Sequence, residues 1–379
     1  MTKFKLIYID PMSYNNLGLY DLNLLLNIQD QSEIYFICSN KFEYKNKISK
    51  VHIIDHYNYH NKPIIIKVLS YIISYFKTLI KVFLVRPDIV HIQWIKIPSL
   101  EIFGYKLIKL LNKKIFLIYT AHNIIPHDIK KVNINLYKKM YSIFDSIIVH
   151  SETTKLTLKN EFYISTNKIS VINHGIFDLS QTITDISKFN FIFNSYNIKY
   201  KSNNEIIFSI LGSLSYYKGV DLIVEAWKTS KLLFLNKNVK LIIAGKPTYK
   251  FEILDNTNIY YDLNFLSNEE YYAYLKITDI LLLPYRQISQ SGVLAAALFE
   301  NVPVIVSNSG GLRDPFKLGN IGWIINDLNV SSVRETLEEV FLNINKVTFD
   351  WSRINKEYSW EKIAKETLNV YKNLKNLQI

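Results

Sequence analysis

The stretch Leu211-Gly212-Ser213-Leu214-Ser215-Tyr216-Tyr217-Lys218-Gly219-Val220-Asp221 decides how the fold of this chain is interpreted. It follows the apolar run 205–212 and precedes a helical pattern, as the turn of a strand–helix unit does. Gly212 allows close approach of the backbone, and Lys218 can offer an ammonium group to a phosphate beside the helix N-terminus. The Gly-Lys-Ser/Thr ending of a P-loop is missing. The stretch predicts an anion site, with a turn carrying a solvated lysine as the alternative.

A second anion cradle is predicted at Gln290-Ser291-Gly292-Val293, directly before the helical run 294–299. Ser291 is a good N-cap, and the amides of Gly292 and Val293 would point toward negative charge. Ordinary helix capping is the alternative. The preceding apolar run, 279–285, would end at the same sheet edge as Lys218, and two helix N-termini at one edge suit a diphosphate.

Ala244-Gly245-Lys246 ends another apolar run of this half of the chain. We predict that Gly245 and Lys246 also belong to this anion site, with Lys246 adding a third positive contribution. A solvated lysine is the alternative at this position. Ser213 lies within the first cradle and is predicted to contact the same ligand.

Short apolar runs alternate with helical patterns along the whole chain, which predicts parallel sheets built from strand–helix units. An α/β fold follows, with two doubly wound Rossmann-like domains facing a central cleft. The expected domains are 1–180, a connection at 181–204, a second domain at 205–354 and a crossing helix at 355–379. The expected strands are 4–10, 33–39, 50–55, 88–94, 114–121, 146–151 and 168–173 in the first domain, and 205–212, 239–245, 257–261, 279–285, 302–307 and 322–326 in the second.

Polar residues in the first half follow predicted strands. His122 and Asn123 come directly after 114–121, with His127 and Asp128 close behind, so this segment is expected to face the cleft. The histidine spacing is not that of His-Glu-x-x-His, and Pro126 interrupts any helix between them, so no metal site is predicted. Asn15, Asn16 and Gly18 are expected to form a loop after the first strand, as a ligand contact or a simple turn.

The composition limits the classes of protein to which the chain can belong. The chain has 379 residues, 49% of them hydrophobic, and a net charge of +12. It has a single cysteine, and Met1–Pro11 lacks the apolar stretch of a secretory signal, so a cytoplasmic location is expected. The lysines are spread evenly without a zinc-finger or RNP-like pattern, which argues against nucleic acid and leaves phosphates and lipid headgroups as partners.

Residues 62–84 are the basis of a hypothesis that the protein binds a membrane surface. On a helix of about 100° per residue, the polar side chains fall in one stripe and leave the remaining surface apolar. The longest lysine-free run, Val68–Phe76, is far shorter than the roughly 20 residues of a membrane span. A helix packed on the sheet is one interpretation. The other is a helix that seats the protein on the anionic inner leaflet. The stripe comprises Lys67, Ser70, Ser74, Lys77, Thr78 and Lys81.

The order and spacing of these motifs resemble a retaining GT-B glycosyltransferase of family 4. The segments that carry the resemblance are Gly18, Arg86-Pro87-Asp88-Ile89-Val90-His91, His122-Asn123, Pro126-His127-Asp128, Gly175, Leu211-Gly212 through Tyr217-Lys218-Gly219, Ala244-Gly245-Lys246, Asp279 to Tyr285, Val302-Pro303-Val304-Ile305 and Gly310-Gly311. The resemblance covers nearly the full length.

The resemblance implies transfer of a sugar from a nucleoside diphosphate sugar to a hydroxyl group. The acceptor would be a glycan or lipid-linked saccharide in surface polysaccharide or O-antigen biosynthesis. It implies Lys218 on the diphosphate and His122 near the transferred sugar as the catalytic residues. The acceptor would bind mainly in the first domain, and neither a metal nor another cofactor would be required.

One departure from the family pattern concerns two glutamates that have seven residues between them. Their positions match Ile288 and Ala296, and neither is acidic. The identity of the donor and the retaining or inverting outcome therefore stay open. A GT-B sugar-nucleotide epimerase and a non-catalytic glycan or nucleotide binder are the alternative functions.

Overall fold

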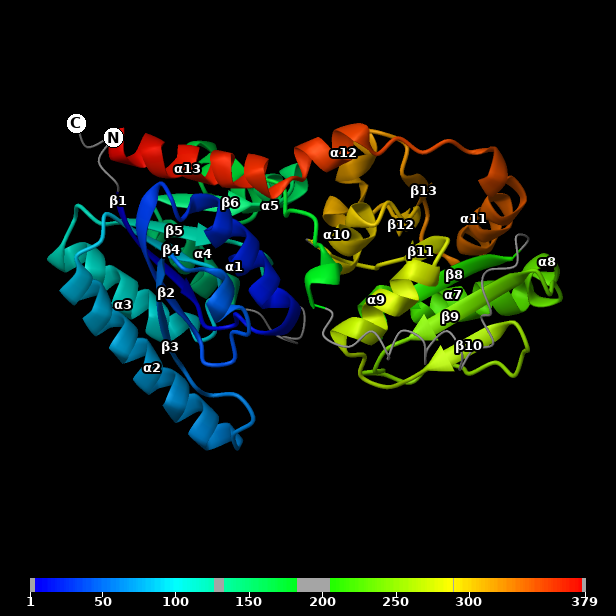
Figure 1. Ribbon diagram of the computed structural model, residues 1–379, viewed down its shortest axis with the longest axis horizontal. Helices are drawn as coiled ribbons and strands as arrows, with labels where there is room; N and C mark the ends of the chain where they lie inside the picture. The colour runs from blue at the N-terminus through cyan, green and yellow to red at the C-terminus, as the bar shows by residue number, and fades with distance from the viewer. Residues whose placement is uncertain (1–3, 126–132, 183–204, 289, 377–379) are drawn as a thin grey trace. The chain divides into compact units, whose positions relative to one another are not determined.

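The computed structural model describes residues 4–125, 133–182, 205–288 and 290–376, and Figure 1 labels its helices and strands. The chain forms two compact units. The first comprises residues 1–175 and 358–379, and the second comprises residues 176–357. Nearly all of the predicted connection at 181–204 lies outside the described residues.

The sheet of the first unit has seven parallel strands in the order β3-β2-β1-β4-β5-β6-β7. The order reverses at β1, which pairs with β2 on one side and β4 on the other. The strands are β1 (Phe4–Asp10), β2 (Ser32–Ser39), β3 (Val51–Tyr57), β4 (Ile89–Ile92), β5 (Phe116–Thr120), β6 (Ser146–Val149) and β7 (Ile169–Val171). The helices between them are α1 (Asn15–Ile28), α2 (Ile64–Val85), α3 (Pro98–Leu111), α4 (Ile134–Ile143) and α5 (Glu152–Asn160).

The sheet of the second unit has six parallel strands in the order β10-β9-β8-β11-β12-β13. Its order reverses at β8. The strands are β8 (Ile206–Leu211), β9 (Val239–Ala244), β10 (Ile259–Asp262), β11 (Ile280–Leu283), β12 (Val304–Ser307) and β13 (Gly322–Ile325). The helices are α7 (Val220–Thr229), α8 (Lys231–Phe234), α9 (Asn268–Ile277), α10 (Gly292–Phe299), α11 (Val330–Asn343) and α12 (Ser352–Glu357).

Both sheets confirm the predicted α/β class with two Rossmann-like domains, and every predicted strand is present. The prediction succeeds because central parallel strands are covered on both faces and therefore consist of continuous apolar runs. All four residues of β11 and of β12 are buried, for example. In the second unit the core extends to Trp227 of α7, whose indole N–H donates to Oδ1 of Asn258 at 3.3 Å.

The last helix, α13 (Trp360–Asn376), belongs to the first unit and packs on α1. Its Tyr371 is fully buried, and the phenol oxygen lies 2.6 Å from Nδ1 of His91 on β4. Lys375 pairs with Asp88 at 3.3 Å. Helix α13 thus belongs to the same unit as the first strand, β1.

Helix α2 packs by its less apolar side. The buried side chains are Tyr71, Ser74, Tyr75, Thr78, Leu79 and Val82. Ser74 donates to the carbonyl of His56 at 2.8 Å, and Thr78 donates to the Tyr57 hydroxyl at 3.1 Å. Part of the polar stripe predicted from the sequence therefore faces the protein, because these hydroxyls find buried acceptors there.

The opposite side of α2 leaves large apolar side chains exposed. They are Ile64, Ile65, Ile66, Val68, Leu69, Ile73, Phe76, Ile80 and Leu84. Among the described residues, α2 is also the helix whose length and composition would allow it to span a membrane. In this structure it lies beside α3 on the first unit, as Figure 1 shows. The two helices approach closely at Gly104 of α3, where a Cβ atom would lie 2.2 Å from the Tyr75 hydroxyl.

Candidate active site

Lys218 lies where the strand order of the second sheet reverses, in the short 3-10 turn Tyr216–Lys218 between β8 and α7. Ligands of open α/β sheets bind at the carboxyl ends of the strands at this point. The Lys218 side chain is only 5% exposed, and Nζ donates to the carbonyl of Leu211 at 3.2 Å. Among the described residues no carboxylate lies within ion-pair distance of Nζ. Burial lowers the pKa of Lys218 to about 8. An anion bound here would supply the missing charge.

Glycines keep the space next to Lys218 open. Gly212 has a φ of +85°, and a Cβ at this position would lie 3.3 Å from Nζ of Lys218 and 3.8 Å from the side chain of Val293. Gly245 ends β9, where a Cβ would lie 1.9 Å from the Gly212 carbonyl oxygen. Only glycine permits this approach of the two loops. The structure therefore brings Gly212, Lys218 and Val293 together, as predicted from the sequence.

The first turn of α10 supplies the second part of the cradle. Ser291 is buried and caps the helix, accepting from the Leu294 amide at 3.2 Å. Gly292 and Val293 occupy the first two helical positions, whose amides have no acceptor within a helix. Gly292 is exposed, and a Cβ there would contact only Phe177, at 3.7 Å. The helix end therefore presents amide donors and the positive end of its dipole.

The remaining predicted donor residues lie at the rim of this site. Lys246 is exposed, and its carbonyl accepts from the Leu214 amide at 2.9 Å. Ser213 is also exposed, with its hydroxyl 3.4 Å from that of Ser215. Lys246 thus supports the loop through its backbone, while its ammonium is solvated.

Arg286, which sequence reasoning missed, holds the Lys218 turn in place. Its guanidinium makes two hydrogen bonds to the Asp221 carboxylate, at 2.9 and 2.6 Å, and stacks 4.0 Å from the ring centre of Tyr216. Burial acts to raise the pKa of Asp221, but hydrogen bonds from Arg286 and Tyr249 outweigh it and lower that pKa. The sequence signal that could have identified this pair is an arginine shortly after β11 together with an aspartate in the first turn of α7.

The positions that match the family's glutamates are apolar and enclosed. Ile288 and Ala296 are both buried. The Ile288 carbonyl also explains Gly310, where a Cβ would lie only 1.7 Å from that oxygen. This corner of the site is therefore a packed backbone contact and supplies no carboxylate.

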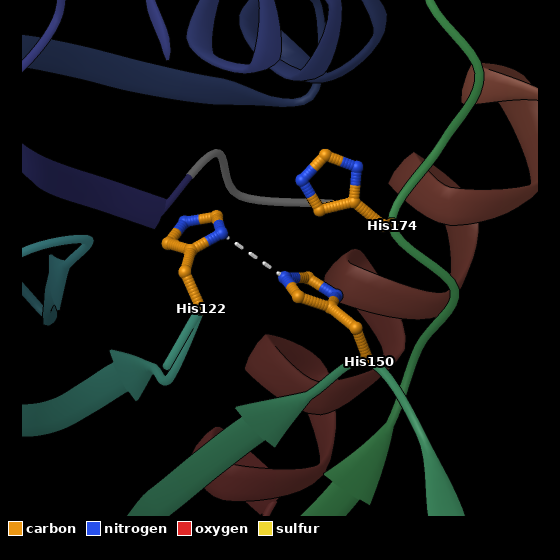
Figure 2. A group of neighbouring side chains, drawn as sticks. All are labelled: His122, His150 and His174. Carbon is orange, nitrogen blue, oxygen red and sulfur yellow. Dashed lines mark hydrogen bonds between the residues drawn. The ribbon is translucent and has the colours of Figure 1, made fainter. Parts of the chain in front are cut away.

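Three histidines gather at the carboxyl edge of the first sheet, as Figure 2 shows. His122 follows β5, His150 follows β6, and His174 follows β7. Burial lowers the pKa of His150 to about 3 and that of His174 to about 4, and it lowers the pKa of His122 well below its usual value. The ring of Trp94 stacks on His122 at a centroid distance of 5.0 Å. Sequence reasoning selected His122 alone and missed its two partners.

The other site residues predicted in the first unit have different outcomes. Asn123 follows His122 and is half-buried, while His127 lies outside the described residues. The predicted loop at Asn15, Asn16 and Gly18 is wrong, because α1 begins at Asn15; the side chains of Asn15 and Asn16 are not among those described. At Gly18 a Cβ would lie 3.3 Å from the Phe42 ring, so this glycine serves packing.

Comparison with known proteins identifies the family. Residues 193–353 match the family described as glycosyl transferases group 1, and residues 30–178 match Glycosyltransferase Family 4. An uncharacterized glycosyltransferase of Methanocaldococcus jannaschii is 26% identical over 262 residues, covering 65% of this chain and 64% of that protein. A 41.2 kDa protein in the cps region of Klebsiella pneumoniae is 28% identical over 242 residues, covering 61% of this chain and 63% of that protein. The matched regions span less than two thirds of these relatives.

Solved structures share the fold over nearly the whole chain. Anabaena HepE in complex with UDP has a TM-score of 0.68 at 12% identity, covering 98% of this chain and 100% of that one. Two Rossmann-like domains with these parallel sheets form a GT-B fold. The chain belongs to the group 1 glycosyltransferases of family 4.

The pKa of Lys218 predicts how the binding of inorganic diphosphate at this site would depend on pH. A bound diphosphate stabilises the ammonium form, so its binding would take up a proton once free Lys218 has lost one. The dissociation constant should therefore be constant near pH 7 and rise by roughly tenfold per pH unit above pH 8. Isothermal titration calorimetry in buffers of different ionisation enthalpy measures both the dissociation constant and the number of protons taken up. The exposed-lysine variant Lys246→Gln should keep this slope and Lys218→Gln should lose it, whereas a flat wild-type profile to pH 10 would contradict the assignment.

Proposed function

We propose that this protein transfers a sugar from a nucleoside diphosphate sugar to a hydroxyl group of an acceptor. The observation that carries the proposal is the buried Lys218 ammonium beside the first turn of α10, with Gly212 leaving room between them. The similar Anabaena protein has been solved with UDP, with UDP and glucose, and with UDP-glucose. These complexes support a nucleotide-sugar donor for the present chain.

In this mechanism the bond between the anomeric carbon and the diphosphate oxygen breaks, and the acceptor oxygen forms the new bond. Negative charge develops on the leaving diphosphate, where Lys218 and the amides of Gly292 and Val293 stabilise it. The leaving phosphate takes the acceptor proton when configuration is retained, so we assign no general base. We propose His122 as the residue of the first unit that contacts the transferred sugar.

Replacement of Lys218 tests its part in the reaction. Lys218→Ala should raise the transition-state free energy by roughly 2–4 kcal/mol, a 30- to 900-fold loss in kcat/KM, because the removed group faces developing charge. The assay is mass spectrometry of products from a panel of UDP-, GDP- and TDP-sugars with saccharide acceptors. Thermal unfolding should change little, since Lys218 has no ion-pair partner among the described residues.

Lys246→Ala is the matched control, because it removes an exposed lysine from the end of the neighbouring strand. It should keep near-wild-type activity. Near-wild-type kcat/KM in Lys218→Ala would instead show that Lys218 takes no part in the reaction. Release of free nucleoside diphosphate without any transfer product would favour the epimerase alternative.

Transfer should not require a divalent metal, because a lysine and helix amides occupy the place that a metal takes in other transferases. Activity should survive EDTA treatment. Loss of activity on chelation, restored by added magnesium or manganese, is the result that would refute this part of the proposal.

We further propose that the acceptor is a lipid-linked saccharide for surface polysaccharide, reached at the cytoplasmic face of a membrane. The exposed apolar side of α2 supports this proposal, together with Phe103, Leu110 and Leu111 on the adjacent α3. Lys77 on α2 and Lys106 on α3 are exposed, as is Lys113, which follows α3. Apolar side chains flanked by lysines are typical of helices that lie in an anionic lipid surface.

Vesicle co-sedimentation measures this association. Binding should rise with the fraction of anionic lipid and fall with salt, and the double variant Ile73→Glu/Ile80→Glu should abolish it, since these residues are 57% and 58% exposed. The control Leu235→Glu/Phe265→Glu changes two apolar residues of the second unit that are 73% and 72% exposed, and it should bind as the wild type does. Equal recovery of the wild type in the supernatant with neutral and anionic vesicles at low salt would leave the exposed side of α2 without this role.

A further inference from the structure

His122, His150 and His174 follow three neighbouring parallel strands, β5, β6 and β7. The ring nitrogens that face one another all lie within 4.8 Å. Figure 2 shows the three rings converging, with His122 and His150 in direct contact. The proposed sugar transfer assigns no role to His150 or His174.

The outer hydrogen bonds of two rings determine which nitrogens carry protons. Nδ1 of His150 lies 2.8 Å from the Ile172 carbonyl, and Nε2 of His122 lies 2.9 Å from the amide oxygen of Gln93. The Ile172 carbonyl only accepts, so Nδ1 of His150 donates and Nε2 of the same ring carries the lone pair. This Nε2 and Nδ1 of His122 face one another across a hydrogen bond of 3.3 Å, so the two nitrogens share one proton.

A metal ion can replace the shared proton, take both nitrogens as ligands and leave the outer hydrogen bonds in place. Two nitrogens bound to a tetrahedral Zn²⁺ at 2.0–2.1 Å lie about 3.3–3.4 Å apart. The observed separation of 3.3 Å matches that edge of the tetrahedron.

We propose that His122, His150 and His174 form a binding site for a transition-metal ion of the Zn²⁺ class. His174 supplies the third ligand and moves toward the other two on binding. A set of three imidazoles without a carboxylate selects zinc, cobalt, nickel or copper over magnesium and calcium.

The surroundings are those of a metal centre. Gln93 and the Ile172 carbonyl orient two ligand rings in the way that outer hydrogen-bond partners of metal-binding histidines do. Tyr20 packs edge-on against the rings of His122 and His150, at centroid distances of 4.8 and 5.7 Å. Three protein ligands leave the fourth position of a tetrahedral ion open to water or a substrate oxygen.

Metal binding has a consequence for activity that rests on the proposed function. His122 is the residue assigned to the transferred sugar, and a metal ion would take its inner nitrogen. Occupancy of the site should therefore inhibit transfer, while chelation relieves the inhibition. The ion regulates the enzyme and takes no part in breaking the glycosidic bond.

Titration with Co²⁺ alone tests the site without any sugar substrate. The EDTA-treated, dialysed full-length protein should bind one Co²⁺ per chain with the intense visible absorption of four-coordinate cobalt, and Zn²⁺ should displace it. His174→Ala and His150→Ala should each lose the band. His52→Ala, which removes an exposed histidine from the same sheet, should keep it. Gln93→Leu should bind about 10–100-fold more weakly, as loss of an outer partner does.

Circular dichroism of each variant shows whether it is folded, and His174→Ala is the decisive one because His174 is only half-buried. Absence of the band in the wild type, or its persistence in folded His174→Ala, would overturn the site. The activity assay is separate: the ratio of rates with and without Zn²⁺ should fall below one in the wild type and return to one in His174→Ala. A protein that binds Co²⁺ but transfers no sugar would refute the proposed function and leave the metal site standing.

Discussion

Parallel pairing of the strands is the constraint on which the rest of the structure depends. In the first unit β1 pairs with β2 and β4, and in the second β8 pairs with β9 and β11. Parallel neighbours require a crossover, so every strand ends at the same edge of its sheet. Residues far apart in the sequence therefore meet there. Gly212 and Val293 come together in this way, as do the three histidines that follow β5, β6 and β7.

Burial of ionisable groups gives these two edges opposite chemistry. At the edge of the second sheet a lysine is enclosed with a neutral carbonyl as its hydrogen-bond partner, so the site is short of negative charge. At the edge of the first sheet two of the imidazoles have oxygen atoms behind them as hydrogen-bond partners, so their other ring nitrogens face each other. The first arrangement suits a phosphate and the second suits a metal ion.

Helix α2 shows that a helix need not bury its most apolar side. Ser74 and Thr78 are buried because strand β3 beneath them offers a carbonyl, a phenol and an imidazole as partners. The isoleucines of the other side then remain at the surface. Such a surface costs free energy in water unless something apolar covers it, and the proposed contact with a membrane provides the cover.

The sequence by itself determined the fold class, the strands and the Lys218 cradle, because buried parallel strands are continuous apolar runs and the glycine and lysine lie within seven residues of one another. It also selected Ser291, Gly292 and Val293, since an N-cap and the turn behind it are local features. Only the tertiary structure joined His150 and His174 to His122 and placed Arg286 against Asp221. These pairs are separated by 28 to 65 positions in the sequence, and no local periodicity records which side chains a sheet brings to one edge. The side that α2 buries was likewise decided by its partners, His56 and Tyr57, because hydrogen bonds to buried acceptors outweighed the hydrophobic pattern of the helix.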